Sequence, residues 1–297
     1  MKLLAFERSG ARTLGILVEG RVVALDSLAP NLPKTMEQLL ESGAAILARI
    51  ADLSSGALGG VPVESVTLLA PLIRPGKFLG IGLNYLSHAD ELRAHGLVPD
   101  TTHQIWFNKQ TSCITGPQDP IHLPAVSVQL DYEGELGIVI GRRCRHVAAA
   151  DAHRVIAGYM VINDISVRDW QKRAPTATLG KSFDTHGPIG PWITTADEIP
   201  DPESLDIRTM VDGVVVQQGN SHDLIHGIAA MIAHLTTVMT LEPGDILATG
   251  TPSGVAQGRT PPTWLRAGQV VRVEIEGLGA IENRVVAEPV SETTTIV

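Results

Sequence analysis

Cysteine, aromatic residues and basic residues are all scarce in this chain of 297 residues. Its two cysteines, Cys113 and Cys144, lie far apart and form no Cys-x-x-Cys pair, which excludes a disulfide scaffold and a thiolate metal site and fits a reducing cytoplasm. Lysine and arginine number 23 against 32 acidic residues, and no basic block or aromatic-basic stripe occurs. We therefore expect no nucleic-acid partner.

The sequence also has no segment suited to a membrane. One uncharged run, 224–241, approaches the length of a membrane-spanning helix, but its histidine, glycine and threonine residues make it too polar for a bilayer. At the N-terminus, Glu7 and Arg8 place charges before the apolar core of an export signal could form. The sequence thus predicts a cytoplasmic protein with no membrane partner.

Apolar residues are plentiful enough for a large core. Hydrophobic residues make up 44% of the chain and charged residues 19%, a composition typical of globular proteins. Residues 1–28 alternate turn signals with short apolar runs, as in small β-hairpins, and apolar residues recur at helical spacing over 36–50. Because prolines and a glycine follow residue 70, we place a boundary there between a small N-terminal β/α domain, 1–70, and a larger domain, 71–297.

The larger domain is predicted to consist mostly of strands. One amphipathic helix is expected over 223–239, because apolar residues recur there at helical spacing and Pro243-Gly244 follows. The fold class is therefore α+β, predominantly β. The short extended runs that predict strands lie at 130–140, 158–162, 207–216, 246–248, 270–275 and 280–286.

The strand at 130–140 carries the strongest functional signal. Side chains two residues apart point to the same face of a strand, so Asp131, Glu133 and Glu135 would share one face at spacings of about 7 Å. Carboxylates this close repel when desolvated, and a cation between them removes that cost. The alternative is a solvated acidic edge, but the strand continues into the apolar residues 138–140, which favours an interior strand and a metal site.

Asp164 is a further ligand candidate. It follows an apolar strand at 158–163, where a strand passes into a helix; the alternative is an Asx-turn residue that caps the next helix. Ligation by carboxylate oxygens alone favours a hard ion, Mg²⁺ first and Mn²⁺ or Ca²⁺ next, and disfavours zinc.

A His-x-x-Glu pair, His88 and Glu91, could place an imidazole and a carboxylate in contact on a helical turn and so form a general base. The alternative is an inert pair on an exposed helix. Two loop-like segments, 180–184 with Lys181 and 247–255 with Thr251, suit carboxylate binding; a surface lysine and a simple tight turn are the alternatives. His222 and His226, four residues apart, lack the glutamate of a zinc motif and are interpreted as structural.

Five segments in this order resemble the fumarylacetoacetate hydrolase family over residues 75–290. They are Asn84-Tyr85-x-x-His88-x-x-Glu91, Asp131-Tyr132-Glu133-Gly134-Glu135-Leu136, Asn163-Asp164-x-Ser166-x-Arg168-Asp169-x-Gln171, Gly180-Lys181-Ser182-Phe183 and Thr249-Gly250-Thr251-Pro252-x-Gly254-Val255. The resemblance implies a C-terminal domain that is a mixed β-sandwich roll, a small N-terminal β domain, a homodimer and a divalent metal, usually Mg²⁺.

The resemblance also assigns roles to single residues. It implies that Glu133, Glu135 and Asp164 hold the metal, with Asp131 outside the ligand set. His88 and Glu91 match the catalytic pair of the family's lid and Lys181 its active-site lysine, while Lys109, Gln171 and Thr251 match positions at the substrate. The chain lacks the additional upstream aspartate ligand of the longer eukaryotic enzymes, so it is similar to the shorter, acylpyruvase-like branch. His226 stands where many members carry an aromatic residue.

The implied activity is metal-dependent hydrolysis of a C–C bond in an acylpyruvate-type 2,4-dioxo acid, such as fumarylpyruvate, through a metal-stabilised enolate. The substrate would be a small anionic 2-oxo acid. Within the same chemistry, the alternatives are an oxaloacetate decarboxylase, or a decarboxylase or isomerase of 2-hydroxymuconate-type dicarboxylates from aromatic catabolism. A non-catalytic metal-dependent binding protein of this fold is a further alternative, which the His-Glu pair and the carboxylates disfavour.

Overall fold

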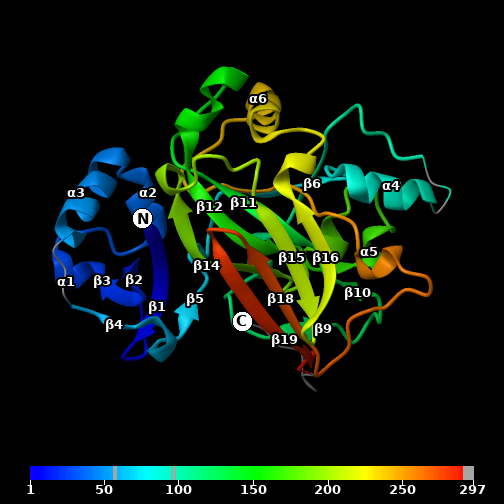
Figure 1. Ribbon diagram of the computed structural model, residues 1–297, viewed down its shortest axis with the longest axis horizontal. Coiled ribbons are helices and arrows are strands. Elements are labelled where there is room, and N and C mark those ends of the chain that lie inside the picture. Colours follow the sequence, from blue (N-terminus) through cyan, green and yellow to red (C-terminus); the bar gives the residue numbers. More distant parts are fainter. Residues whose placement is uncertain (56–58, 95, 97, 290–297) are drawn as a thin grey trace, which may run out of the picture.

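Two β-sheets packed face to face form the body of the protein (Figure 1). The computed structural model describes residues 1–55, 59–94, 96 and 98–289. Strands outnumber helices in this part of the chain, and the α+β, predominantly β class predicted from the sequence is confirmed.

The larger sheet has 12 strands and runs through both ends of the molecule. Most neighbouring strands are antiparallel, while β17 is parallel to β6 and β8 is parallel to β14. In spatial order, the strands are β4 (Val61–Pro62), β3 (Arg21–Ala24), β2 (Ala11–Val18), β1 (Lys2–Arg8), β14 (Gly187–Thr195), β12 (Ile156–Asn163), β11 (Gly134–Ile140), β17 (Ile246–Ala248), β6 (Phe78–Gly82) and β7 (Ile105–Asn108), with β5 (Leu68–Leu69) beside β1 and β8 (Ile114–Thr115) beside β14.

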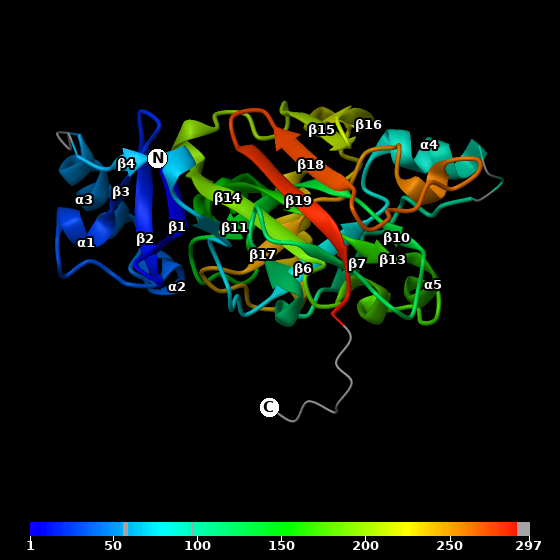
Figure 2. The same ribbon diagram turned by 90° about the horizontal axis from the view of Figure 1, so that it is seen from below.

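A five-stranded sheet lies across the larger one, and Figure 2 shows its strands β18 and β19 passing in front of β14 and β11. Its order is β16 (Val214–Asn220), β15 (Asp206–Val211), β18 (Val270–Ile275), β19 (Gly279–Ala287) and β9 (Ile121–Leu123). A separate two-stranded ladder pairs β10 (Leu130–Asp131) with β13 (Ser166–Val167).

The helices lie outside the sheets. They are α1 (Leu25–Leu28), α2 (Met36–Glu41), α3 (Ala44–Ser54), α4 (Leu86–Ala94), α5 (Arg168–Gln171) and α6 (Ile228–Val238). Short 3-10 turns include η3 (Ala149–Val155), η4 (Thr178–Lys181), η6 (Ser221–Asp223) and η7 (Ala256–Gly258). None of the described helices has both the length and the apolar character needed to cross a membrane.

The main core fills the space between the two sheets. β18 alternates buried and partly exposed residues, so its Val271, Val273 and Ile275 point inward while Arg272 and Glu274 point outward. Apolar side chains of β11, β12, β15 and α6 complete this core: Leu136, Ile138, Val161, Ile207, Met231, Ile232 and Leu235. This packing holds the ends of β11 and β12 rigidly, and the functional site lies at those ends.

The N-terminal strands continue the larger sheet. β1 pairs with β14, with Lys2 opposite Thr194 and Leu3 opposite Ile193, and Figure 1 shows these strands with α1, α2 and α3 at one side of the molecule. The domain boundary near residue 70 remains a prediction, and residues 290–297 of the second predicted domain lie outside the described residues.

Three predicted elements differ in their bounds. The helix expected over 36–50 is interrupted because Gly43 has a φ of 74°, so α2 ends and α3 begins there. The strand expected over 207–216 is a hairpin, since Asp212 and Gly213 both adopt positive φ and turn the chain from β15 into β16. The helix expected over 223–239 begins only at Ile228.

Candidate active site

Three buried carboxylates meet where two neighbouring strands end. Glu133 directly precedes β11, Glu135 is the second residue of β11, and Asp164 directly follows β12. Because β11 and β12 are antiparallel, the start of one lies beside the end of the other, and the Asp164 N–H donates to the Glu133 carbonyl at 2.8 Å. One oxygen of each side chain lies within 4.8 Å of the others. The strand pairing therefore brings the three predicted ligands together.

Asp131 lies outside this cluster, and the prediction of one continuous strand over 130–140 is wrong. The chain forms two strands there, β10 and β11, with two residues between them. The Asp131 carboxylate accepts hydrogen bonds from Nε of Arg168 at 2.8 Å and from the backbone N–H groups of Ala256 and Gln257 at 2.7 and 3.0 Å. These partners are distant in sequence, and one of them, Arg168, also contacts Glu133.

Three buried cations surround the cluster. The Lys181 ammonium donates to Glu133 and to Asp164, both at 2.5 Å, so this lysine is not a surface residue. Lys109 contacts Asp164 at 2.7 Å, and Arg168 contacts Glu133 at 2.6 Å. Because charge-assisted hydrogen bonds are strong in a buried site, these contacts fix the orientation of both carboxylates.

Glu133 and Glu135 differ in whether positively charged side chains balance their buried negative charge. Burial by itself raises the pKa of Glu133, but the two cations that contact it hold its pKa well below the usual range. Glu135 forms no ion pair with the described residues and accepts a hydrogen bond from the Gly250 N–H at 2.8 Å. Its burial, with the charges of Asp164 and Glu133 nearby, raises its pKa well above the usual range. Glu135 is thus the residue that most needs an added cation.

This donor set fits a divalent metal ion. Together with Asp131, the site contains four buried carboxylates, and three cations face them: Lys109, Arg168 and Lys181. A divalent cation between the clustered oxygens would relieve their repulsion and allow Glu135 to ionise. All the donor atoms of the cluster are carboxylate oxygens, which suits Mg²⁺, Mn²⁺ or Ca²⁺.

The predicted His-Glu pair forms on α4. His88 Nδ1 lies 2.9 Å from Glu91 Oε2, and Glu91 Oε1 accepts a hydrogen bond from the Gly254 N–H at 2.9 Å. The two side chains are only 12% and 15% exposed, so they do not form an exposed surface pair. Because the carboxylate accepts, the Nδ1 of His88 carries the proton and its Nε2 is left as a base.

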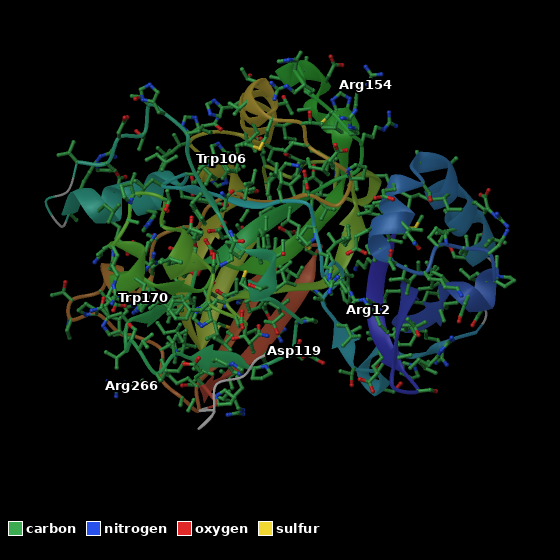
Figure 3. All side chains as sticks on the ribbon, turned by 180° about the vertical axis from the view of Figure 1, so that it is seen from behind. Arg12, Trp106, Asp119, Arg154, Trp170 and Arg266 are labelled. Carbon is green, nitrogen blue, oxygen red and sulfur yellow. The ribbon has the colours of Figure 1, made fainter. Side chains whose placement is uncertain are left out.

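One cavity connects His88 to two of the clustered carboxylates, Glu133 and Glu135. It has a volume of about 350 Å³ and is lined on its polar side by His88, Glu133, Glu135, Arg168, Gln171, Lys181 and Thr251. Its apolar lining residues include Leu83, Leu92, Ile105, Trp106 and Pro175. Figure 3 locates this cavity through its lining residue Trp106, which lies on the body of the molecule and far from Arg12 of the N-terminal strands. The cavity thus offers both charged and apolar side chains to one small molecule.

Two further predicted residues line the cavity, each with an orientation set by its neighbours. Gln171 Oε1 accepts from Nη1 of Arg168 at 2.9 Å, so its amide NH₂ is directed elsewhere. Thr251 donates to the Gly134 carbonyl at 2.9 Å and accepts from Nε2 of Gln217 at 2.8 Å. Gln217 is buried and also accepts from the Gly134 N–H at 3.0 Å. The sequence analysis missed it, because nothing in the pattern of β16 separates it from an ordinary strand residue.

Lys109 is close to the cluster but lies behind it. Its ammonium contacts Asp164 and donates to the backbone carbonyls of Lys181 and His186, which uses its three N–H donors. Lys109 does not line the cavity.

His226 is held through its backbone, which exchanges hydrogen bonds with the Asn84 side chain, and burial lowers the pKa of His226.

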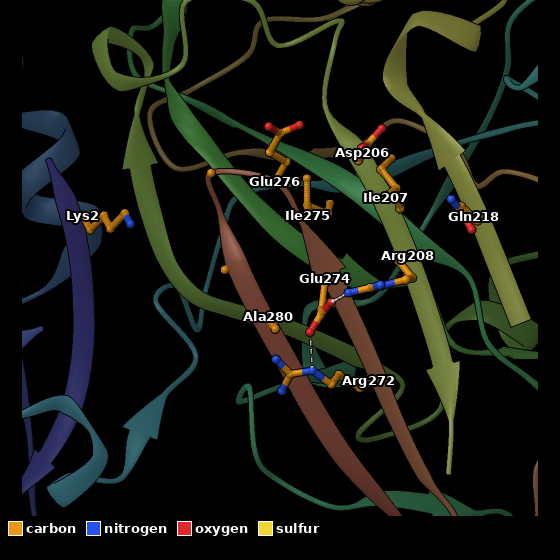
Figure 4. A pocket seen from close by; sticks show the side chains of 12 residues that line it. Lys2, Asp206, Ile207, Arg208, Gln218, Arg272, Glu274, Ile275, Glu276 and Ala280 are labelled. Carbon is orange, nitrogen blue, oxygen red and sulfur yellow. Dashed lines mark hydrogen bonds and ion pairs between the residues drawn. The ribbon is translucent and has the colours of Figure 1, made fainter. Parts of the chain in front are cut away.

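A larger pocket of about 580 Å³ lies on the outer face of the five-stranded sheet (Figure 4). Its arginines are already paired: Glu274 contacts both Arg208 and Arg272 at 2.6 Å. No cluster of metal-ligating residues occurs there among the described side chains. The smaller cavity, which is lined by His88, Glu133 and Glu135, is therefore the candidate active site.

Comparison with known proteins points to one family. Residues 77–286 match the model of the family described as Fumarylacetoacetate (FAA) hydrolase C-terminal. A protein of Burkholderia multivorans, whose name proposes a hydrolase without giving a substrate, is 45% identical over 282 residues, which cover 94% of this chain and 96% of that protein. The match therefore extends well beyond the candidate site.

Solved structures with the same fold carry different activities in their names. Maleylpyruvate hydrolase from Sphingobium sp. SYK-6, in complex with manganese(II) and pyruvate, is 32% identical with a TM-score of 0.81 and covers 97% of this chain and 100% of its own. A 2-hydroxyhepta-2,4-diene-1,7-dioate isomerase from Mycobacterium marinum is 32% identical with a TM-score of 0.76 and covers 97% of this chain and 99% of its own. Similarity of this kind supports a shared fold and does not choose between these reactions.

Proposed function

This chain belongs to the fumarylacetoacetate hydrolase family, and on that premise we propose that it is a metal-dependent hydrolase of acylpyruvate-type 2,4-dioxo acids. The observation that carries the proposal is that His88, which is paired with Glu91, lines the same cavity as the buried carboxylates Glu133 and Glu135. A base and a cluster suited to a metal ion thus reach one small substrate. A binding protein without activity would not require the base.

In this proposal, Glu133, Glu135 and Asp164 hold the metal, Mg²⁺ first and Mn²⁺ or Ca²⁺ as alternatives. When bound, the metal supplies Lewis acidity to the carboxylate and 2-oxo oxygens of the substrate. The complex of the Sphingobium hydrolase with manganese(II) and pyruvate supports a 2-oxo acid at this site.

His88 carries the proton transfers. Its Nε2 removes a proton from water, while Glu91 holds the Nδ1 proton and stabilises the imidazolium. The water oxygen attacks the 4-oxo carbon, the bond between C3 and C4 breaks, and its electron pair passes to the leaving 2-oxo acid. His88 then returns the proton to C3. The products are a carboxylic acid and a pyruvate-type 2-oxo acid.

The remaining site residues orient the substrate. Lys181, already in contact with Glu133 and Asp164, adds positive charge where negative charge develops on the leaving group. Gln171, with its NH₂ free of Arg168, donates to a substrate oxygen, and Thr251 contacts the substrate from the opposite loop. Lys109 positions Asp164 and Lys181 from behind.

An isomerase or decarboxylase of 2-hydroxymuconate-type dicarboxylates, or an oxaloacetate decarboxylase, is the second candidate. The 32% identity to the Mycobacterium marinum isomerase favours it, because the same site can support chemistry without an attacking water. The deciding experiment is a screen of purified protein with acylpyruvates, hydroxymuconate-type dienoates and oxaloacetate, with Mg²⁺ or Mn²⁺ and with EDTA. Carboxylic acid release from an acylpyruvate supports the hydrolase; turnover of the other substrates alone contradicts it.

Oxalate is expected to inhibit competitively and only in the presence of the metal. This planar dianion resembles the leaving 2-oxo acid, so its oxygens would take the positions of the substrate carboxylate and 2-oxo groups. Lys181→Met should weaken this inhibition and slow catalysis together, because the lysine serves the same negative charge in both cases. Inhibition constants and rates of both proteins provide the measurement. Oxalate inhibition that needs no metal, or that Lys181→Met leaves unchanged, would place the anion elsewhere.

We also expect the protein to form a homodimer, as the resemblance to the family implies. Charged residues make up 19% of the chain, and several strands are strongly apolar, so one sheet face is a candidate for burial against a second subunit. Light scattering at micromolar protein concentration tests this expectation. The mass of a single 31.6 kDa chain would contradict it.

A further inference from the structure

The loop at 254–258 contacts the Glu91 carboxylate. The Gly254 N–H donates to Glu91 Oε1 at 2.9 Å. At the other end of the loop, Gly258 lies so close that a Cβ atom added to it would overlap Oε1 and Cδ of Glu91. The Glu91 carboxylate therefore lies against the backbone of this loop as well as against His88.

Hydrogen bonds to the Asp131 carboxylate hold the same loop in place. This fully buried carboxylate accepts from the N–H groups of Ala256 and Gln257, at 2.7 and 3.0 Å, and from Nε of Arg168 at 2.8 Å. The Tyr132 hydroxyl donates to the Gly254 carbonyl at 3.0 Å. The loop is thus bonded to the segment that leads into the predicted metal ligands, and it cannot move away from Glu91 without breaking buried hydrogen bonds.

Because residue 258 is a glycine, the Glu91 carboxylate can pack directly against the backbone there. Gly258 does not adopt a left-handed φ, so an alanine there would meet no backbone strain. The three atoms nearest to such a Cβ all belong to the Glu91 carboxylate, so this carboxylate would have to move to admit it. The closeness of this packing therefore sets where Glu91 stands, and through the 2.9 Å bond it sets where His88 stands.

We propose that Gly258, on a loop fixed by Asp131, is a positioning residue that holds Glu91 at the distance needed to orient His88. The inference rests on the proposed function, in which His88 is the base. It adds that the base is oriented by backbone packing, and that this packing is tied to the strand segment of the metal ligands. A displacement of about 1 Å in such a group can cost about 10²-fold in rate.

A double-mutant cycle of Gly258→Ala and Glu91→Asp tests the proposal. Gly258→Ala should lower kcat by about 10²-fold, with KM and metal affinity nearly unchanged, because the Cβ displaces Glu91 and not the substrate contacts. Glu91→Asp shortens the side chain and makes room for the Cβ. In that background, Gly258→Ala should cost little more, so that the two effects are strongly non-additive. Gly59→Ala, where a Cβ would meet nothing within 4 Å, is the matched control.

A measurement without substrate separates this proposal from the proposed function. The ¹⁵N signals of His88, assigned by their loss in His88→Gln, should report an Nδ1–H tautomer in the native protein and a mixed tautomer in Gly258→Ala. An unchanged His88 signal and kcat in Gly258→Ala, or additive effects in the cycle, would overturn the proposal. If native protein cleaves no 2,4-dioxo acid, the proposed function fails, and the tautomer measurement still decides the role of Gly258. If Gly258→Ala alone fails to fold, a folded double variant supports the contact and an unfolded one contradicts it.

Discussion

Alanine in place of Glu133, Glu135 or Asp164 is expected to abolish turnover and leave a folded protein. These carboxylates meet within 4.8 Å, and each supplies one oxygen to the proposed metal site. EDTA should have the same effect on the native protein, and added Mg²⁺ or Mn²⁺ should restore activity. Rates with and without chelator, together with circular dichroism of each variant, provide the measurement.

Metal binding should depend on pH through the protonation of Glu135. Its pKa is raised in the metal-free protein by burial and by Asp164 and Glu133, so it binds a proton there that a divalent cation must displace. Metal affinity is therefore expected to fall as the pH falls, and Glu135→Gln should release fewer protons on metal addition than the native protein. Glu276→Gln, an acidic residue of the outer pocket, is the control. In the EDTA experiment described above, undiminished turnover of the chelated enzyme would contradict the metal mechanism.

The predicted ligands could be recognised from the sequence because strand geometry is local. Glu133, Glu135 and Asp164 lie beside apolar runs that form β11 and β12, and antiparallel pairing of two such runs joins their ends. The resemblance to the family then separated Asp131 from the ligands, whereas side-chain alternation alone placed it with them. The interruption between β10 and β11 depends on donors from Arg168 and from 256–257, which no pattern within 130–140 reveals.

The missed features share this dependence on distant partners. α6 begins at Ile228, five residues later than predicted, because Glu203 Oε1 accepts the Ile228 N–H at 2.6 Å and so caps the helix from another segment. Gln217 reaches Gly134 and Thr251 from a strand with no catalytic motif. The hairpin turn was different: Asp212-Gly213 is a turn signal that the sequence does contain, and the prediction overlooked it.

Loss of the imidazole or of its carboxylate should slow catalysis without weakening metal binding. His88→Ala or Glu91→Ala is expected to lower kcat by roughly 10²–10⁴-fold, the usual cost of a lost general base, because water would then have no acceptor for its proton. Metal affinity should stay nearly unchanged, since neither side chain belongs to the carboxylate cluster. Steady-state kinetics on the best substrate of the screen, with metal titration of each variant, provide the test.

The chain offers a matched control for this pair. His103 Nδ1 lies 3.2 Å from Asp100 Oδ2, another histidine and carboxylate three residues apart, but its side chain is 83% exposed. His103→Ala should therefore leave kcat unchanged, since an exposed pair outside the cavity cannot reach the substrate. Equal rates for His88→Ala, Glu91→Ala and the native protein would mean that the base lies elsewhere. Chemistry without an attacking water, as in an isomerase, would then explain the cavity better, because the carboxylate cluster and Lys181 suffice for it.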